Sequence, residues 1–277
     1  MRLTVLGTAT PYPRPGNACS GYLLTSSVAP ETETAPENET APETDAAAKA
    51  RPTAQTTVWL DAGTGTLAEL QRHTEIAELD AIWVSHRHAD HSADLLVAYY
   101  ALRFAERAPA APIPLIAPEG MLERLAAFLG PNSVAELPRV FEHRPMSGFG
   151  DAEFGDLRLE WGPVQHGVPA FGLTVLQAGR RFAYSGDSAP CLSLDEIADD
   201  ADTLLLEAGY DHPAAGGEAP AHHTPEDAGR TAAAAGVKRL VLTHIAGTVT
   251  ADEVVARAAA HFAGEIVVAR PGDHFTI

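Results

Sequence analysis

The chain has 277 residues, of which 45% are hydrophobic and 20% charged, and its formal net charge is −18 at pH 7. The apolar content is ample for a folded core, and the acidic balance argues against an anionic membrane or bare nucleic acid as a partner. With two cysteines and no run of about 18 apolar residues, neither a disulfide framework nor a transmembrane helix is expected.

The chain opens directly with a predicted strand over residues 1–7 rather than a secretory signal, so a cytoplasmic location is expected. Two further strands are predicted over residues 21–25 and 57–61. Between them lies a stretch at about 29–56 without aromatic side chains, of which residues 29–44 are a loose Thr-Ala-Pro-Glu repeat. Such a segment cannot bury enough surface to offset its ordering entropy. It predicts a disordered acidic insertion in a single domain that spans residues 1–277, with a docking role as the alternative.

Strands and helices then alternate along the chain, which predicts an α/β fold. Helices are predicted from about residue 66 and over residues 93–108, 119–129, 225–236 and 250–262. Strands are predicted over residues 79–84, 113–117, 157–165, 171–177, 181–185, 238–243 and 265–269. On the helix at 93–108, Tyr99, Tyr100 and Phe104 are expected to pack in the core, with lining of a pocket as the alternative. Phe171 is a candidate for stacking on a base.

One six-residue segment, His86-Arg87-His88-Ala89-Asp90-His91, contains four side chains that can bind a metal. It follows the predicted strand at 79–84, so it lies on a turn at the carboxyl end of a strand, where α/β sheets commonly place their sites. His86 and His88 are two apart in extended backbone and point the same way. Asp90 and His91 follow the turn and can face a second point. The segment predicts two metal ions rather than a histidine-rich surface turn.

Three later side chains of ligand type each end an apolar run. They are His166, Asp187 and His244. A zinc ion takes about four ligands, and two ions about 3.5–4 Å apart need more side chains than the six-residue segment supplies. Any one of these residues alone would be interpreted as a capped strand end. Together with the histidine segment, they predict the remaining ligands.

With these residues in this order, the chain resembles the metallo-β-lactamase superfamily over nearly its whole length. Asp61, the segment 86–91, His166, Asp187 and His244 are similar to its successive motifs. The resemblance implies an α/β (α+β) fold, the αββα four-layer sandwich, with two zinc ions; manganese or iron would suit the same ligands. It assigns His86, His88 and His166 to one metal, Asp90, His91 and His244 to the other, and Asp187 to both. Asp61 would orient a ligand histidine, with a helix N-cap as the alternative.

Two further motifs resemble the ribonuclease Z-like phosphodiesterases of this superfamily. The run Leu204-Leu205-Leu206-Glu207-Ala208 is similar to their Glu-Ala motif, and residues 222–229 to their His-x-Thr motif. The resemblance implies that Glu207 orients His222 and that His222 gives a proton to the leaving-group oxygen, as a general acid. His223 is the alternative donor. Helix capping by residues 224–227 is the non-catalytic interpretation.

The expected function is that of a dinuclear-zinc hydrolase, a phosphodiesterase on a small cyclic-nucleotide-like substrate. Only residues 167–186 separate His166 from Asp187, which leaves no room there for the long arm with which ribonuclease Z grips transfer RNA. Residues 20–24, 183–187 and 242–245 resemble short bacterial cyclic-nucleotide phosphodiesterases, whereas the turn at 7–11 is more like ribonuclease Z. Asp90 would also orient the attacking water. The resemblance further implies a homodimer.

Three alternatives stay open. Ribonuclease Z itself, acting on transfer-RNA precursors, would need a basic groove and a steep salt dependence. A hydrolase of carboxylic esters, sulfate esters or lactones would leave Glu207 and His222 apart from each other. A non-catalytic metal-binding or docking protein would use the acidic segment, although a purely structural site does not leave open metal positions.

Overall fold

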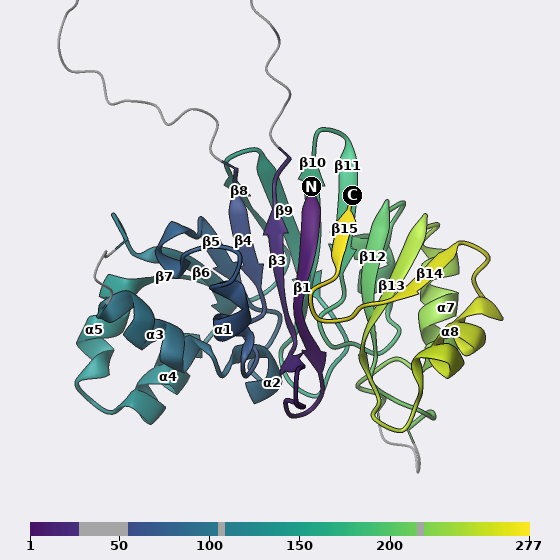
Figure 1. Cartoon of the computed structure of the whole chain (residues 1–277), viewed down its shortest axis with the longest axis horizontal. Helices are drawn as coiled ribbons and strands as arrows, with labels where there is room; N and C mark the ends of the chain where they lie inside the picture. The colour runs from purple at the N-terminus through teal and green to yellow at the C-terminus, as the bar shows by residue number, and fades with distance from the viewer. Residues whose placement is uncertain (28–54, 105–108, 215–218) are drawn as a thin grey trace, which may run out of the picture.

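The computed structural model describes residues 1–27, 55–104, 109–214 and 219–277, so the expected insertion at about 29–56 lies almost wholly outside the described residues. Two mixed β-sheets face each other, and helices cover the outer face of each (Figure 1). This is the αββα four-layer sandwich, as predicted. Within the described ranges, none of the helices has the length and apolarity to cross a bilayer.

The first sheet has the strand order β15-β1-β3-β4-β5-β6-β7, with the short β2 beside β1. Its strands are β1 (Arg2–Ala9), β2 (Ala18–Cys19), β3 (Gly21–Thr25), β4 (Thr57–Leu60), β5 (Ala81–Trp83), β6 (Ile113–Pro118), β7 (Phe141–Met146) and β15 (His274–Thr276). Its helical elements are α1 (Thr66–Leu70), the 3₁₀ turn η1 (Ile76–Glu78), α2 (Ala89–Ser92), α3 (Leu95–Arg103), α4 (Met121–Leu129) and α5 (Ser133–Val140).

The second sheet has the order β14-β13-β12-β11-β10-β9-β8. Its strands are β8 (Gly150–Phe154), β9 (Leu157–Pro163), β10 (Phe171–Gln177), β11 (Arg180–Tyr184), β12 (Thr203–Ala208), β13 (Arg239–Ile245) and β14 (Glu265–Val268). Its helices are α6 (Leu192–Ala198), α7 (Pro225–Ala234) and α8 (Ala251–Ala259). In both sheets a run of antiparallel pairs continues into a run of parallel pairs.

Three apolar layers hold the sandwich together, because the central strands are buried on both faces. In β12, Leu205 points into the layer between the sheets, while Leu204 and Leu206 point toward the outer helices. In β5, Trp83 faces the inner layer and Ile82 faces the outer one. This period-two alternation explains why these strands appear in the sequence as continuous apolar runs.

Of the helix expected over residues 93–108, residues 105–108 lie outside the described residues. In the described part its extent is wrong, because α2 already begins at Ala89 and α3 ends at Arg103. As a result Phe104 follows the helix, and 70% of it is exposed, stacked on the half-exposed ring of Tyr100. Only Tyr99 of the three aromatic residues packs in the core. Phe171 is buried between the sheets, so this candidate for stacking on a base does not face a substrate.

The loops that follow the central strands of both sheets meet at one edge of the sandwich, and within the first sheet backbone contacts join the loops before β3, after β4 and after β5. Ala62 N donates to His91 O (2.7 Å), Ser20 N donates to Asp90 O (3.1 Å), and Gly63 N donates to Ser20 O (3.0 Å). The approach is so close that a Cβ atom on Gly63 would lie 2.1 Å from Asp90 O. Only glycine fits at this crossing, because the opposing atoms are backbone.

We expect Gly63→Ala to lower the free energy of unfolding by about 1–3 kcal/mol, as overpacking of a tight contact does, and to weaken metal binding by moving Asp90. Gly148→Ala is the matched control, because a Cβ atom there meets nothing within 4 Å. Urea unfolding and zinc titration of both variants test this. Equal behaviour of the two would show that the crossing tolerates a side chain.

Candidate metal centre

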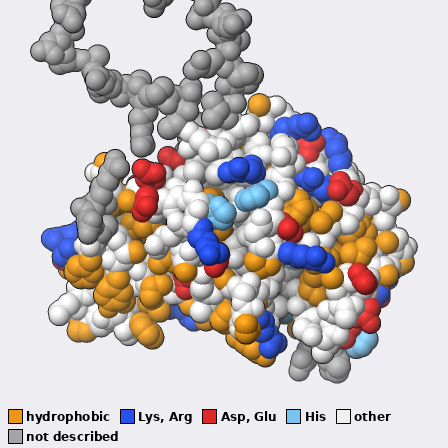
Figure 2. Space-filling view, viewed as in Figure 1, with side chains coloured by type: hydrophobic (Ala, Val, Ile, Leu, Met, Phe, Trp, Pro, Cys, Tyr) orange, Lys and Arg blue, Asp and Glu red, His pale blue; other side chains and the backbone are white. Residues whose placement is uncertain are grey.

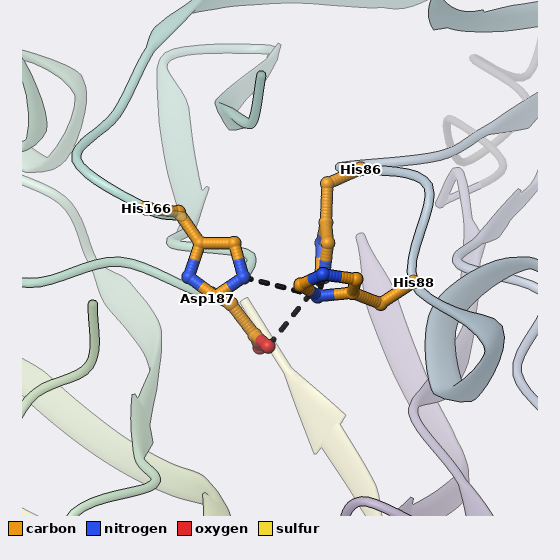
Figure 3. A group of neighbouring side chains, drawn as sticks. All are labelled: His86, His88, His166 and Asp187. Atoms are coloured by element: carbon orange, nitrogen blue, oxygen red, sulfur yellow. Dashed lines mark hydrogen bonds and ion pairs between the residues drawn. The ribbon is translucent and has the colours of Figure 1, made fainter. Parts of the chain in front are cut away.

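Four side chains from three segments converge on one point at this edge (Figure 3). They are His86, His88, His166 and Asp187, and one donor atom of each lies within 4.8 Å of the others. His88 Nδ1 lies 3.0 Å from His86 Nε2 and 3.1 Å from His166 Nε2. Asp187 Oδ2 lies 3.6 Å from His86 Nε2. The turn after β5 thus meets the ends of β9 and β11, which belong to the opposite sheet.

A second group lies directly beside the first. It consists of Asp90, His91 and His244. Asp187 Oδ1 lies 3.1 Å from His91 Nε2, and Asp187 Oδ2 lies 3.4 Å from His244 Nε2. The Asp187 carboxylate is therefore shared by the two groups. All seven side chains expected as ligands are gathered in one place, in the two sets that the resemblance implies.

Among the described residues, two buried atoms of this centre lack a partner that a bound cation would supply. His91 Nε2 and Asp187 Oδ1 are 3.1 Å apart, and neither has a hydrogen-bond partner in the described part of the chain. His91 Nδ1 is already engaged with Asp61 at 2.7 Å. When His91 is neutral, two lone pairs face each other, an arrangement that a proton or a metal ion relieves. Imidazole and carboxylate donors suit zinc, manganese or iron, so the residues fit a dinuclear metal site.

Burial sets the charge state of most of these histidines. It holds the pKa of His86 well below its ordinary value, lowers the pKa of His244 to about 3, and also lowers the pKa of His88 and His166. Neutral imidazoles offer the lone pair that a metal requires. Burial alone would also lower the pKa of His91, but the carboxylates of Asp187 and Asp61 raise it well above the ordinary value.

Asp61 fixes the ring of His91 from behind. It is fully buried and accepts four hydrogen bonds: from Ser85 N (2.7 Å), Ser85 Oγ (2.8 Å), Tyr184 Oη (2.6 Å) and His91 Nδ1 (2.7 Å). The Tyr184 ring in turn lies edge-on to Trp83, with centroids 6.1 Å apart. The N-cap of α1 is Gly65, without a side-chain cap bond, so Asp61 does not play the alternative capping role.

Other ring nitrogens are held in the same way by groups that the sequence did not single out. His244 Nδ1 is 3.0 Å from Ser20 Oγ, His86 Nδ1 is 3.0 Å from Ser85 Oγ, and His166 Nδ1 donates to Ala221 O (2.8 Å). These contacts leave the opposite nitrogen of each ring facing the centre. A serine ahead of a strand carries no sequence signal of such a role, because its partner is distant in the chain.

Glu207 and His222 meet at the same centre. Glu207 is fully buried at the end of β12, and its Oε1 accepts from His222 Nδ1 (2.9 Å) and from Ser188 N (3.0 Å). The His222 ring stacks on His244, with centroids 5.7 Å apart, and lies 5.0 Å from His166. Burial raises the pKa of Glu207 to about 7. Burial opposes a charge on His222, but its hydrogen bond to Glu207 raises the pKa of His222.

His223 lies away from the centre. It is fully buried, its Nδ1 donates to Ser188 O, and its Nε2 is 3.0 Å from Thr231 Oγ1. Both ring nitrogens are thus occupied, so His223 is not placed to act on a substrate. Thr224 caps α7 together with Asp227, so helix capping exists beside the Glu207–His222 pair and does not involve it.

A cavity of about 190 Å³ adjoins His244. Residues of the loop after β1, among them Thr10, Arg14 and Asn17, line it opposite Gly247. Thr10 Oγ1 is 3.5 Å from Asp90 Oδ2, and the Arg14 guanidinium stacks on Tyr12 at 4.1 Å from the ring centroid. The turn at 7–11 was noted in the sequence only for its resemblance to ribonuclease Z, whereas Arg14 and Asn17 were not predicted to lie near the centre.

Comparisons with known proteins agree with this fold. The family model described as the beta-lactamase superfamily domain matches residues 56–245. An uncharacterised protein of Mycobacterium tuberculosis, Rv1339, is 30% identical over 275 residues, which cover 96% of this chain and 88% of that protein. A ribonuclease Z of Mycobacterium marinum is 29% identical, with coverage of 75% and 83%. The metallo-β-lactamase fold protein YhfI of Bacillus subtilis has a TM-score of 0.76 at 20% identity, with coverage of 99% and 98%.

We expect Asp61→Asn to weaken zinc binding by about 10–100-fold, because an amide cannot accept all four hydrogen bonds and His91 loses its orientation. Asp187→Asn should abolish binding of the metal pair. Asp80→Asn is the matched control, because among the described residues the Asp80 carboxylate bonds Thr57 at the surface, away from the centre. Competition with a chromogenic chelator measures the affinities. Wild-type affinity in Asp61→Asn would contradict the orienting role.

A second prediction concerns stability and pH. Burial lowers the pKa of His223 from 6.5 to about 4. Between these values the unfolded chain binds a proton that the folded protein does not. The free energy of unfolding therefore falls as the pH falls, by up to about 1.4 kcal/mol per pH unit from this group.

In His223→Gln this contribution is absent. The slope of the free energy of unfolding against pH should therefore be smaller, by up to the equivalent of about one bound proton. Urea unfolding of both proteins in the same metal-free buffer measures the two slopes. Parallel slopes would show that His223 is charged in the folded state as it is in the unfolded state.

Proposed function

The chain belongs to the β-lactamase superfamily, and we propose that it is a dinuclear-metal phosphodiesterase that acts on a small, cyclic-nucleotide-like substrate. The observation that carries this proposal is the contact between Glu207 and His222 beside the shared carboxylate of Asp187. A hydrolase of easily cleaved esters has no need of such a pair, whereas a phosphodiester with an alkoxide leaving group does.

The ligand assignment follows the two groups of donors. His86, His88 and His166 would hold one zinc ion, Asp90, His91 and His244 the other, and Asp187 would bind both. Bound metal ions supply water of lowered pKa and offset the charge of the phosphate oxygens. Asp90 Oδ2 is 3.9 Å from His91 Nε2 and 4.0 Å from His244 Nε2. That position suits a carboxylate that both binds and orients the attacking water.

His222 is the proposed general acid. Its Nδ1–H donates to Glu207, which leaves Nε2 for the oxygen of the leaving group. Hydrogen bonding to the Glu207 carboxylate raises the pKa of His222, so more of the ring carries a proton at neutral pH. Glu207 itself is held by Ser188 N and by Gly209 N, so the pair is fixed before the substrate arrives.

A small substrate fits this molecule better than a polyanion. The net charge is −18, and on the face in Figure 2 the Lys and Arg side chains of the described residues stand in separate small groups rather than a continuous stripe. Binding of a long nucleic acid depends on neutralising many phosphates at once. The second candidate is ribonuclease Z, which the 29% identical relative favours.

We expect His222→Ala to lower kcat for cyclic AMP by about 10²–10⁴-fold, the usual contribution of general acid catalysis. Hydrolysis of bis-p-nitrophenyl phosphate should change far less, because p-nitrophenolate leaves without a proton. Zinc content should stay at the wild-type value. Steady-state kinetics on both substrates measure the difference, with His143→Ala on β7 as the matched control.

Precursor transfer RNA belongs in the same assay. Cleavage of this RNA without turnover of cyclic AMP would favour the ribonuclease Z candidate. Equal losses on both phosphodiesters in His222→Ala would remove the proton-donor role. Hydrolysis of none of the three substrates would overturn the phosphodiesterase proposal and leave the metal centre as it is.

A further inference from the structure

One side chain of the surface helix α8 holds both ends of the segment that carries His222. This segment leads from β12 to α7, and the structure describes its residues 209–214 and 219–224. Arg257 Nη1 donates to Asp211 Oδ1 (2.8 Å), near the start of the segment, and Nη2 donates to the carbonyl of Asp211. Arg257 Nε and Nη2 donate to the two carboxylate oxygens of Glu226 (2.8 and 2.9 Å), in the first turn of α7.

The guanidinium is therefore bidentate toward Glu226 and simultaneously bound to Asp211. A planar fork with several donors suits this double contact, which a lysine ammonium cannot reproduce. Thr248 Oγ1 adds a bond to Asp211 Oδ2 (3.0 Å). Hydrogen bonds from Arg257 lower the pKa of Asp211 and Glu226, so both carboxylates are ionised at neutral pH.

The ends of the segment come together next to the His222 ring. Tyr210 N donates to His223 O (3.0 Å), and the Tyr210 ring lies 4.9 Å from that of His222. A Cβ atom on Gly209 would lie 2.8 Å from His222 Nδ1, so little space separates the ring from the start of the segment. A change in the distance between Asp211 and Glu226 would therefore move His222 relative to Glu207.

We propose that Arg257 is a positioning residue for proton transfer, which acts by keeping His222 in hydrogen-bond contact with Glu207. The inference rests on the proposed function, in which His222 is the general acid. The hydrogen bonds described for Arg257 reach Asp211 and Glu226 and no candidate metal ligand. Its loss should therefore impair the proton donor while the metal centre stays intact.

The test compares two substrates that differ in their need for an acid. In the zinc-loaded full chain, Arg257→Ala should lower kcat for cyclic AMP by about 10–100-fold, since a misplacement of about 1 Å costs a catalytic group this much. The kcat for bis-p-nitrophenyl phosphate and the zinc content should stay near wild type. Arg257→Lys should lose part of the activity, because one ammonium cannot hold both carboxylates.

Arg230→Ala is the matched control. Arg230 also lies on the surface, and its hydrogen bonds in the described part of the chain reach Asp227 within α7 and His261, so it contacts the α7 end of the segment but does not link that end to Asp211. The decisive measurement is the double variant. In a His222→Ala background, Arg257→Ala should cause no further loss on cyclic AMP, because the group it positions is already absent.

Additive losses in the double variant, equal losses on both substrates, or loss of zinc would each show a merely structural role and overturn the inference. Wild-type kinetics of Arg257→Ala would overturn it as well. In both cases a selective effect of His222→Ala would leave the proposed function standing. If His222→Ala shows no preference between the substrates, the proton-donor role and this inference fail together.

Discussion

The whole edge of the sandwich depends on keeping one buried carboxylate charged. Asp187 is almost fully buried, and burial alone would raise the pKa of its carboxyl group, yet the histidines around it, foremost the protonated His91 whose Nε2 lies 3.1 Å from Oδ1, hold that pKa well below the ordinary value. Charge can remain there only while cations or positive ring edges surround it. The surrounding rings come from both sheets, so the two halves of the fold must be correctly registered before the carboxylate is compensated. A metal pair at this point would therefore stabilise the association of the halves as well as the chemistry.

The candidate metal ligands and the Glu207–His222 pair require opposite protonation states of their histidines. Burial lowers the pKa of four of the histidines, so their rings stay neutral and their lone pairs are free for metal. His222 differs, because its hydrogen bond to Glu207 outweighs burial and raises its pKa. Both sets share Asp187 as a neighbour. The acidic surface repels an anionic substrate at a distance, and attraction would come from the centre itself. This distribution of charge supports the proposed compact substrate over a long polyanion.

The sequence predicted much of this arrangement because its strongest signals are local. The spacing of His86, His88 and His91 on a turn after an apolar run indicates convergent ligands, and the period-two strands of the core are continuous apolar runs. The strands β7 and β8 were missed because each is a sheet edge with polar or proline residues, such as Pro145, that weaken the strand pattern. The role of Ser20, 224 residues away from His244, and the contacts of Arg257 were beyond prediction, since they depend on tertiary proximity alone.

The contact between Trp83 and Tyr184 has a practical consequence. The indole lies edge-on to a phenol whose hydroxyl bonds Asp61, and Asp61 bonds a candidate ligand ring, so an aromatic pair is connected to the centre through two hydrogen bonds. Withdrawal of electron density from His91 would polarise this chain and alter the surroundings of a fully buried fluorophore. We therefore expect occupancy of the centre to change the intrinsic emission of Trp83, one of three tryptophans in the chain.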